Sequence, residues 1–194
     1  MFTDTTNKKY LSTICKRSNI ELTQNIVNKT YNLTFFVNTK TKSIKEIFTF
    51  DFLFNLLNSL DKSHDFIEST HIIKKTNEND YDLLFIFKHL GANLGVLKKY
   101  LCFNLKKSND TNNNTLFNAV NIKYEDNKIE NLDKVILHFA DMTIVEDKNN
   151  SNNAIVNILF NLEIDTELPK IVHNFVKLVM RNMVINLKQY IDTL

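Results

Sequence analysis

Strict alternation of apolar and polar residues marks much of the chain, most clearly from Ala154 to Ile164. One face of this run is apolar and the other mostly polar, with Val156, Ile158, Phe160, Leu162 and Ile164 against Asn157, Asn161, Glu163 and Asp165. Period-two alternation is typical of an antiparallel strand with one buried side. Apolar, β-branched and aromatic runs predict further strands at Leu33 to Val37, Ile44 to Phe50, Ile67 to Lys74, Tyr81 to His89, Lys99 to Lys106, Leu116 to Tyr124 and Val135 to Val145.

Helical spacing predicts two elements in the first third of the chain. Residues 1–30 are predicted as an N-terminal helical segment, because their apolar residues repeat along one face, beginning with Tyr10, Leu11, Ile14 and Cys15. This segment is locally basic, which favours either a solvated helix face or contact with an anionic membrane surface. Asp51 is a plausible N-cap for a second, short helix.

A long closing helix is predicted over residues 165–194. Thr166 can cap it, and Pro169 lies near the first turn, where its missing N–H has no consequence. A broad apolar stripe runs along it, formed by Val172, Val176, Val179, Met183, Leu187 and Tyr190. Such a helix must cover a large apolar surface, for which the concave face of the preceding sheet is the candidate. The order of elements predicts one α+β domain over 1–194, a curved antiparallel sheet wrapped around its last helix.

Composition narrows the function classes. With 194 residues, 43% hydrophobic and 24% charged, the chain suits one globular domain. The net charge of +2 and the presence of only two arginines, Arg17 and Arg181, argue against a nucleic-acid partner. Two cysteines, Cys15 and Cys102, are too few for a disulfide framework. The sequence also contains neither a recognisable signal peptide nor an apolar run of 18 residues. We therefore expect a cytoplasmic protein.

Motifs of catalysis are missing from the sequence. It contains no G-x-G-x-x-G, G-x-x-x-x-G-K-[ST], H-E-x-x-H, C-x-x-C or G-x-S-x-G motif, and its five histidines have no ligand-like spacing. We therefore predict no catalytic residue, no cofactor, no metal site and no enzymatic activity.

Two polar residues of the predicted strand Val135 to Val145 are candidates for a site. His138 and Asp141 lie three positions apart, which places them on opposite faces of a regular strand, so one of them is expected to point inward. There it is either a satisfied core polar group or a polar contact inside a ligand cavity. Lys98 and Lys99 open another strand, and one of them is either solvated or reaches inward to a carboxylate such as Asp141.

Three segments and the order of elements resemble the START family of lipid-transfer domains, over roughly residues 8 to 194. Residues 50–61 (FDFLFNLLNSLD) are similar to the family's helix before its bent central strands, and residues 97–103 (LKKYLCF) lie where the family has an Arg-Asp-Phe-Val-like strand opening. Residues 168–176 (LPKIVHNFV) are similar to the Leu/Ile-Pro-Lys entry into the C-terminal helix. The family's usual tryptophan and its Arg-Asp pair are missing, and the wider helix-grip superfamily fits almost as well.

The resemblance implies a helix-grip fold with an internal apolar cavity, which is also what a curved sheet around one helix leaves unfilled. The predicted ligand-binding residues are Phe103, Leu105, His138, Asp141, Ile158, Phe160, Leu162, Phe175, Val179 and Met183. We expect the cavity to bind a lipid, a sterol or another hydrophobic small molecule, and the protein to transfer it between membranes. We also expect a monomer that contacts the membrane only transiently. The alternatives are a dry core, a helix-grip co-chaperone or adaptor, and a small cyclase-like enzyme.

Overall fold

The fold is built on one nine-stranded sheet, seen in a computed structural model that describes residues 10–17, 19–54, 67–89, 92, 97–164, 185, 188 and 191. Its strands lie in the order β1-β2-β3-β9-β8-β7-β6-β5-β4. Their bounds are β1 Leu11–Arg17, β2 Ile20–Asn25, β3 Thr30–Asn38, β4 Ile67–Asn77, β5 Asp80–Phe87, β6 Lys99–Asn109, β7 Thr115–Asn121, β8 Asp133–Asp147 and β9 Asn150–Ile164.

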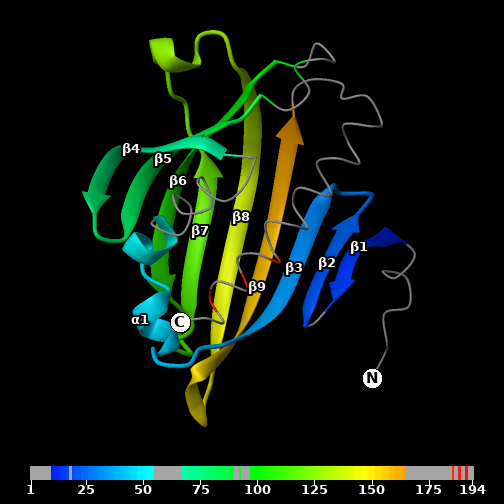
Figure 1. Cartoon of the computed structure of the whole chain (residues 1–194), viewed down its shortest axis with the longest axis vertical. Helices are drawn as coiled ribbons and strands as arrows, with labels where there is room; N and C mark the ends of the chain where they lie inside the picture. The colour runs from blue at the N-terminus through cyan, green and yellow to red at the C-terminus, as the bar shows by residue number, and fades with distance from the viewer. Residues whose placement is uncertain are drawn as a thin grey trace.

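Neighbouring strands of the sheet are antiparallel, and the sheet curves strongly between β9 and β4 (Figure 1). The pairing of β3 with β9 joins residues 30–38 to residues 153–161, so the first three strands add to the sheet beside the last one. The start of β6 also pairs in parallel with the start of β8. The strands predicted at Leu33 to Val37 and at the six segments from Ile67 to Ile164 are confirmed.

The helix predicted within residues 1–30 is wrong, because residues 11–17 and 20–25 form the strands β1 and β2. Asn19 takes a left-handed backbone conformation (φ 64°) and allows the chain to reverse tightly between them. The pairing register shifts between Thr13 and Cys15, so Ile14 lies in a β-bulge. This bulge places two apolar residues in succession, which imitates helical spacing.

The strand predicted from Ile44 to Phe50 is also wrong, because a short helix, α1 (Ile44–Ile47), begins there. Ser43 caps it: the Glu46 carboxylate accepts hydrogen bonds from the Ser43 backbone N–H at 2.8 Å and hydroxyl at 2.9 Å. Residues 50–54 are helical as well, and the Thr49 hydroxyl oxygen accepts the Phe52 N–H at 3.2 Å. Thr49, rather than Asp51, therefore caps the second helix.

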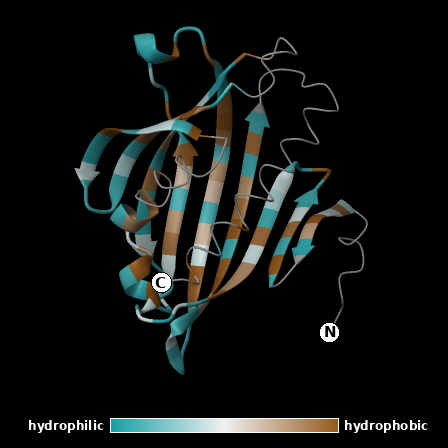
Figure 2. Ribbon diagram, in the orientation of Figure 1, coloured by the Kyte–Doolittle hydropathy of each residue, from teal (hydrophilic) through white to brown (hydrophobic). Residues whose placement is uncertain are grey.

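The concave inner face of the sheet carries most of the core. Figure 2 shows apolar and polar bands alternating along the strands, as the period-two pattern predicts. Ile44, Ile47 and Phe48 of the α1 region pack with the inner-face residues of β2, β3 and β9. A smaller cluster on the opposite face packs β5 and β6 against the segment after β7, and it includes Leu84, Cys102 and Ile129.

The closing helix predicted over residues 165–194 lies outside the described residues except at three positions. Ile185, Lys188 and Ile191 are helical, at the i, i+3, i+6 spacing of one helix face. Ile191 is fully buried in the inner-face core and Ile185 packs against it. Within the described part of the chain, no helix is long and apolar enough to cross a membrane.

Candidate ligand-binding face

A row of side chains crosses the inner face of the sheet from β3 to β5, and we call it the alanine row. Its members are paired from strand to strand in the order Tyr31, Phe160, Ala140, Ala119, Leu105 and Tyr81. Large side chains therefore stand on the outer strands, while the two central strands, β8 and β7, carry only methyl groups. The smallest side chains of the row therefore lie at its centre, where Ala119 is buried and Ala140 packs against the same core cluster.

The flanks of the alanine row are fixed by packing. Tyr31 stacks on Phe160 with ring centroids 5.1 Å apart, and burial raises the pKa of the Tyr31 hydroxyl. On the other flank, Tyr81 is buried against Phe50, and Leu105 packs against the clusters on both sides of the row. The walls are thus held by ordered aromatic and aliphatic groups.

Five of the predicted site residues lie together on this face. Phe103 is buried and meets Phe85 edge-on, with ring centroids 5.1 Å apart. Leu105, Ile158, Phe160 and Leu162 are partly buried and pack against the inner-face clusters. The other three predicted wall residues, Phe175, Val179 and Met183, lie outside the described residues.

His138 and Asp141 lie on the outer face, so the expectation that one of them points inward is wrong. The pairing of β8 with β9 shifts between Leu137 and Phe139, which places His138 in a β-bulge. The extra residue changes the parity of the strand, and positions three apart then share a face. His138 Nε2 lies 2.8 Å from Glu163 Oε2, and Asp141 accepts a hydrogen bond from Asn118 at 2.8 Å; all four residues are exposed.

The two lysines at the start of β6 also have other partners than expected. Lys98 pairs with Glu68, and Lys99 pairs with Asp133 on the neighbouring start of β8. The side chains of Lys99 and Asp133 are only 13% and 22% exposed, which makes this the more buried of the two pairs. Neither lysine reaches Asp141, and both act in the structure by tying strands together.

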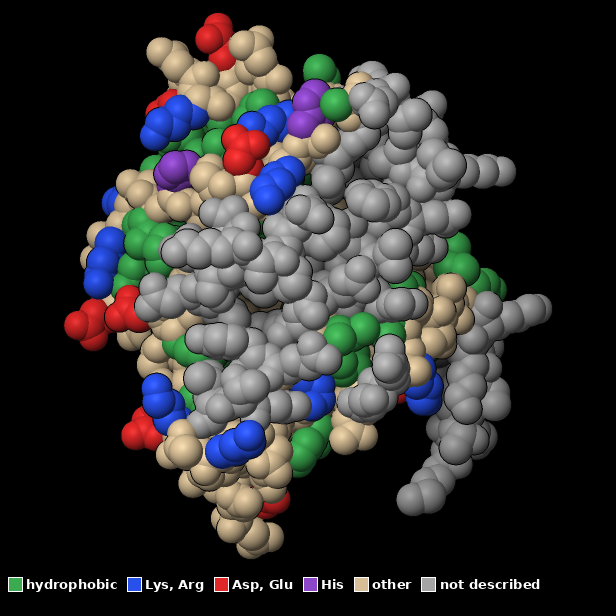
Figure 3. Space-filling model, viewed as in Figure 1, with side chains coloured by type: hydrophobic (Ala, Val, Ile, Leu, Met, Phe, Trp, Pro, Cys, Tyr) green, Lys and Arg blue, Asp and Glu red, His purple; other side chains and the backbone are tan. Residues whose placement is uncertain are grey.

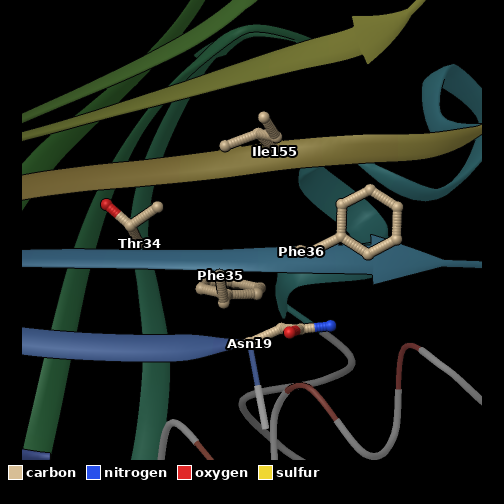
Figure 4. Close-up of a pocket in the computed structure, with 5 residues that line it drawn as sticks. All are labelled: Asn19, Thr34, Phe35, Phe36 and Ile155. Atoms are coloured by element: carbon tan, nitrogen blue, oxygen red, sulfur yellow. The ribbon is translucent and has the colours of Figure 1, made fainter. Parts of the chain in front are cut away.

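A hollow of about 440 Å³ lies on the β2–β3–β9 part of the sheet, lined by Asn19, Thr34, Phe35, Phe36 and Ile155 (Figure 4). Phe36 and Ile155 are cross-strand partners, and Ile155 is 46% exposed on the outer face. This hollow includes none of the predicted wall residues.

A second hollow, of about 310 Å³, opens beside the turn between β4 and β5. It is lined by Thr49, Phe50, Asp51, Lys75, Glu78, Asn79, Tyr81 and Lys107. Lys75 and Lys107 differ in their surroundings: a hydrogen bond with Tyr81, helped by Asp51 and Glu78, raises the pKa of Lys75, whereas burial lowers the pKa of Lys107. We call this the lysine hollow.

Sequence reasoning missed Ala119, Ala140 and Lys107, because their placement depends on which residues are paired across four strands. The only signal for Lys107 is that it continues the alternating inward positions Phe103 and Leu105. Acidic and basic side chains are intermixed around the visible face of the described chain (Figure 3). Among the described residues, no three His, Cys, Asp or Glu side chains gather into a metal-binding group.

Comparison with solved structures identifies the fold as that of the START domains. The human StarD13 (DLC2) lipid transfer and protein localization domain superposes with a TM-score of 0.70 at 9% identity, covering 97% of this chain and 93% of that one. Human StAR-related lipid transfer protein 5 superposes with a TM-score of 0.67 at 12% identity, covering 97% of this chain and 88% of that one. A STAR-related lipid transfer protein from Xanthomonas axonopodis superposes with a TM-score of 0.64 at 10% identity, covering 94% of this chain and 98% of that one. No family model and no curated protein matches the sequence.

Proposed function

We propose that this protein binds a lipid or another hydrophobic small molecule on the inner face of its sheet and carries it between membranes. The observation that carries the proposal is the alanine row, in which the two smallest side chains, Ala140 and Ala119, stand between Phe160 and Leu105. The START fold supports it, since several solved proteins with this fold are described as lipid transfer proteins or domains.

Binding of this kind needs no covalent step. Transfer of apolar surface out of water stabilises the complex by roughly 25 cal/mol per Å². Phe103, Leu105, Ile158, Phe160 and Leu162 would supply the sheet side of the contact. Phe175, Val179 and Met183 remain the predicted helix side. No catalytic group is part of this proposal, and His138 and Asp141, on which the enzyme alternative rests, face away from the alanine row.

Membrane contact has a candidate surface where β1 begins and β2 ends. The Ile26 N–H donates to the Tyr10 carbonyl at 3.0 Å, which brings the two segments together. Ile26 and Val27 are 63% and 68% exposed, with Tyr10 and Leu11 exposed beside them. An exposed apolar tip of this kind suits brief contact with a bilayer. We place the protein in the cytoplasm as a monomer, where the two buried free cysteines would stay reduced.

The test is a large side chain placed at the centre of the alanine row. Full-length protein is incubated with fluorescent-lipid liposomes, re-isolated and examined by native mass spectrometry. We expect wild type to retain lipid, and Ala140→Trp to lose at least 90% of the uptake with a melting shift of only a few degrees. Val145→Trp, on the outer face of the same strand, is the control and should take up lipid like wild type.

Three results would contradict the proposal. Normal uptake by Ala140→Trp would show that the alanine row is not the site. If the face is a dry core, wild type retains no lipid. The tryptophan of Ala140→Trp then overpacks that core and lowers the stability by about 1–3 kcal/mol. A wild type that carries no lipid and binds a protein partner would support the adaptor alternative.

A further inference from the structure

A second row on the inner face ends in a lysine, directly beside the alanine row. Its members are paired across β3, β9, β8, β7 and β6 in the order Leu33, Ile158, Met142, Phe117 and Lys107. Four apolar residues thus lead to one cation. Along β6 itself, Lys107 follows the apolar wall residues Phe103 and Leu105 at the alternate positions that face inward.

Lys107 lies between the buried ring of Phe117 and the mostly polar lining of the lysine hollow. Its side chain is half-buried, and its Nζ lies 5.8 Å from the centroid of the fully buried Phe117 ring. No carboxylate of the described residues lies within ion-pair distance of it. The neighbouring Lys106 points to the other face, is 61% exposed and pairs with Asp80 at 3.4 Å. A desolvated ammonium without a counter-ion is unfavourable, and this is why burial lowers the pKa of Lys107.

The two carboxylates of the lysine hollow act on the other lysine. Asp51 and Glu78 both favour the charged form of Lys75, which also hydrogen-bonds with Tyr81. Burial is what shifts the pKa of Lys107. The hollow of about 310 Å³ is large enough for a carboxylate or a phosphate group, and Thr49 and Asn79 add hydrogen-bonding groups to its lining. The lining thus carries two carboxylates and two lysines, and of these two lysines Lys107 is the one whose charged form burial disfavours.

We propose that Lys107 anchors the anionic head group, a carboxylate or a phosphate, of an amphipathic ligand whose apolar chain lies along Leu105 and the alanine row. The inference rests on the proposed function and adds the class of ligand to it. The anion would replace the hydration that the ammonium loses on burial, through charge-assisted hydrogen bonds. A ligand with the same chain and a neutral head group leaves the lysine unpaired and binds more weakly.

The experiment compares oleate with methyl oleate, which has the same chain and no charge, as competitors for a neutral fluorescent lipid in full-length protein. We expect wild type to bind oleate at least tenfold more tightly than methyl oleate. Lys107→Gln should reduce this preference to less than twofold, whereas Lys107→Arg keeps it. Lys106→Gln removes the adjacent, outward lysine and should behave like wild type. Melting curves show whether each variant is folded.

Oleyl phosphate and inorganic phosphate distinguish the sources of the anion. Preferred binding of oleyl phosphate or oleate, with no competition by millimolar inorganic phosphate, supports a lipid head group. Strong competition by inorganic phosphate that Lys107→Gln abolishes would overturn the lipid part and assign the site to free phosphate. Equal binding of oleate and methyl oleate by wild type overturns the inference and leaves the proposed function standing. Failure of wild type to bind any of the lipids overturns both.

Discussion

Replacement of Ile191 by alanine tests whether the C-terminal segment is part of the core. Ile191 is 0% exposed and packs in one cluster with Val37 and Val156 on the inner face. The change removes three carbon atoms, at roughly 0.8 kcal/mol for each buried CH₂, and leaves a cavity. Together these give a loss of about 2–5 kcal/mol. Domains are stable by only about 5–15 kcal/mol, so the variant should be measurably weaker.

The assay is urea unfolding followed by circular dichroism. With a slope of about 2 kcal/mol per M, the midpoint of Ile191→Ala should fall by about 1–2.5 M. Ile155→Ala is the matched control, because it makes the same chemical change at a residue that is 46% exposed on the outer face. We expect its loss to stay below about 1 kcal/mol.

An Ile191→Ala midpoint equal to that of wild type would refute the reasoning. It would mean that the contact between the helical residues 185, 188 and 191 and the sheet contributes nothing to folding. A large loss in Ile155→Ala would show instead that exposure is a poor guide to the energetics of this sheet.

Two further predictions concern polar groups. Lys99→Met leaves Asp133 without its partner and should destabilise the protein by about 1.5–3 kcal/mol. Lys98→Met removes a more exposed ion pair and should cost no more than about 1 kcal/mol. Thermal melts of both variants measure the difference. Hydrogen bonds from Asn114 lower the pKa of Asp110 below its ordinary 3.8, so the stabilisation from its ionised form is complete above that pH and is lost as the pH falls through the lowered pKa. Urea midpoints of Asp110→Asn and wild type should therefore differ most near pH 7 and converge toward pH 2–3, and a constant difference would contradict the assignment.

The alternating strands were predictable because one side of each is buried, and burial selects every second residue. β9 shows this directly: Ala154 and Val156 are buried, while Ile155 between them is exposed. The strand prediction from Ile44 to Phe50 rested on β-branched and aromatic residues alone, although Ser43 and Glu46 have the spacing of a capping box.

The two β-bulges, at Ile14 and His138, made the predictions from residue periodicity wrong for the same physical reason. An extra residue in one strand changes which later positions face inward, without changing residue type. At Ile14 the bulge made a strand resemble a helix, and at His138 it turned Asp141 and the histidine to the same outer face. Periodicity carries no information about where such an insertion occurs, so errors of this kind spread to every polar residue beyond the bulge.

The candidate site depends on pairing across strands, which alternation within one strand does not determine. Phe103, Leu105, Ile158, Phe160 and Leu162 could be assigned to a buried face one strand at a time. That the smallest side chains meet at the centre of the face follows only when the register sets Ala140 opposite Ala119. The same register places Lys107 beside Phe117, where its charge is desolvated. Both features are thus properties of the pairing: a one-residue slip of β7 against β8 would separate the two alanines, and a slip of β6 against β7 would move Lys107 away from Phe117.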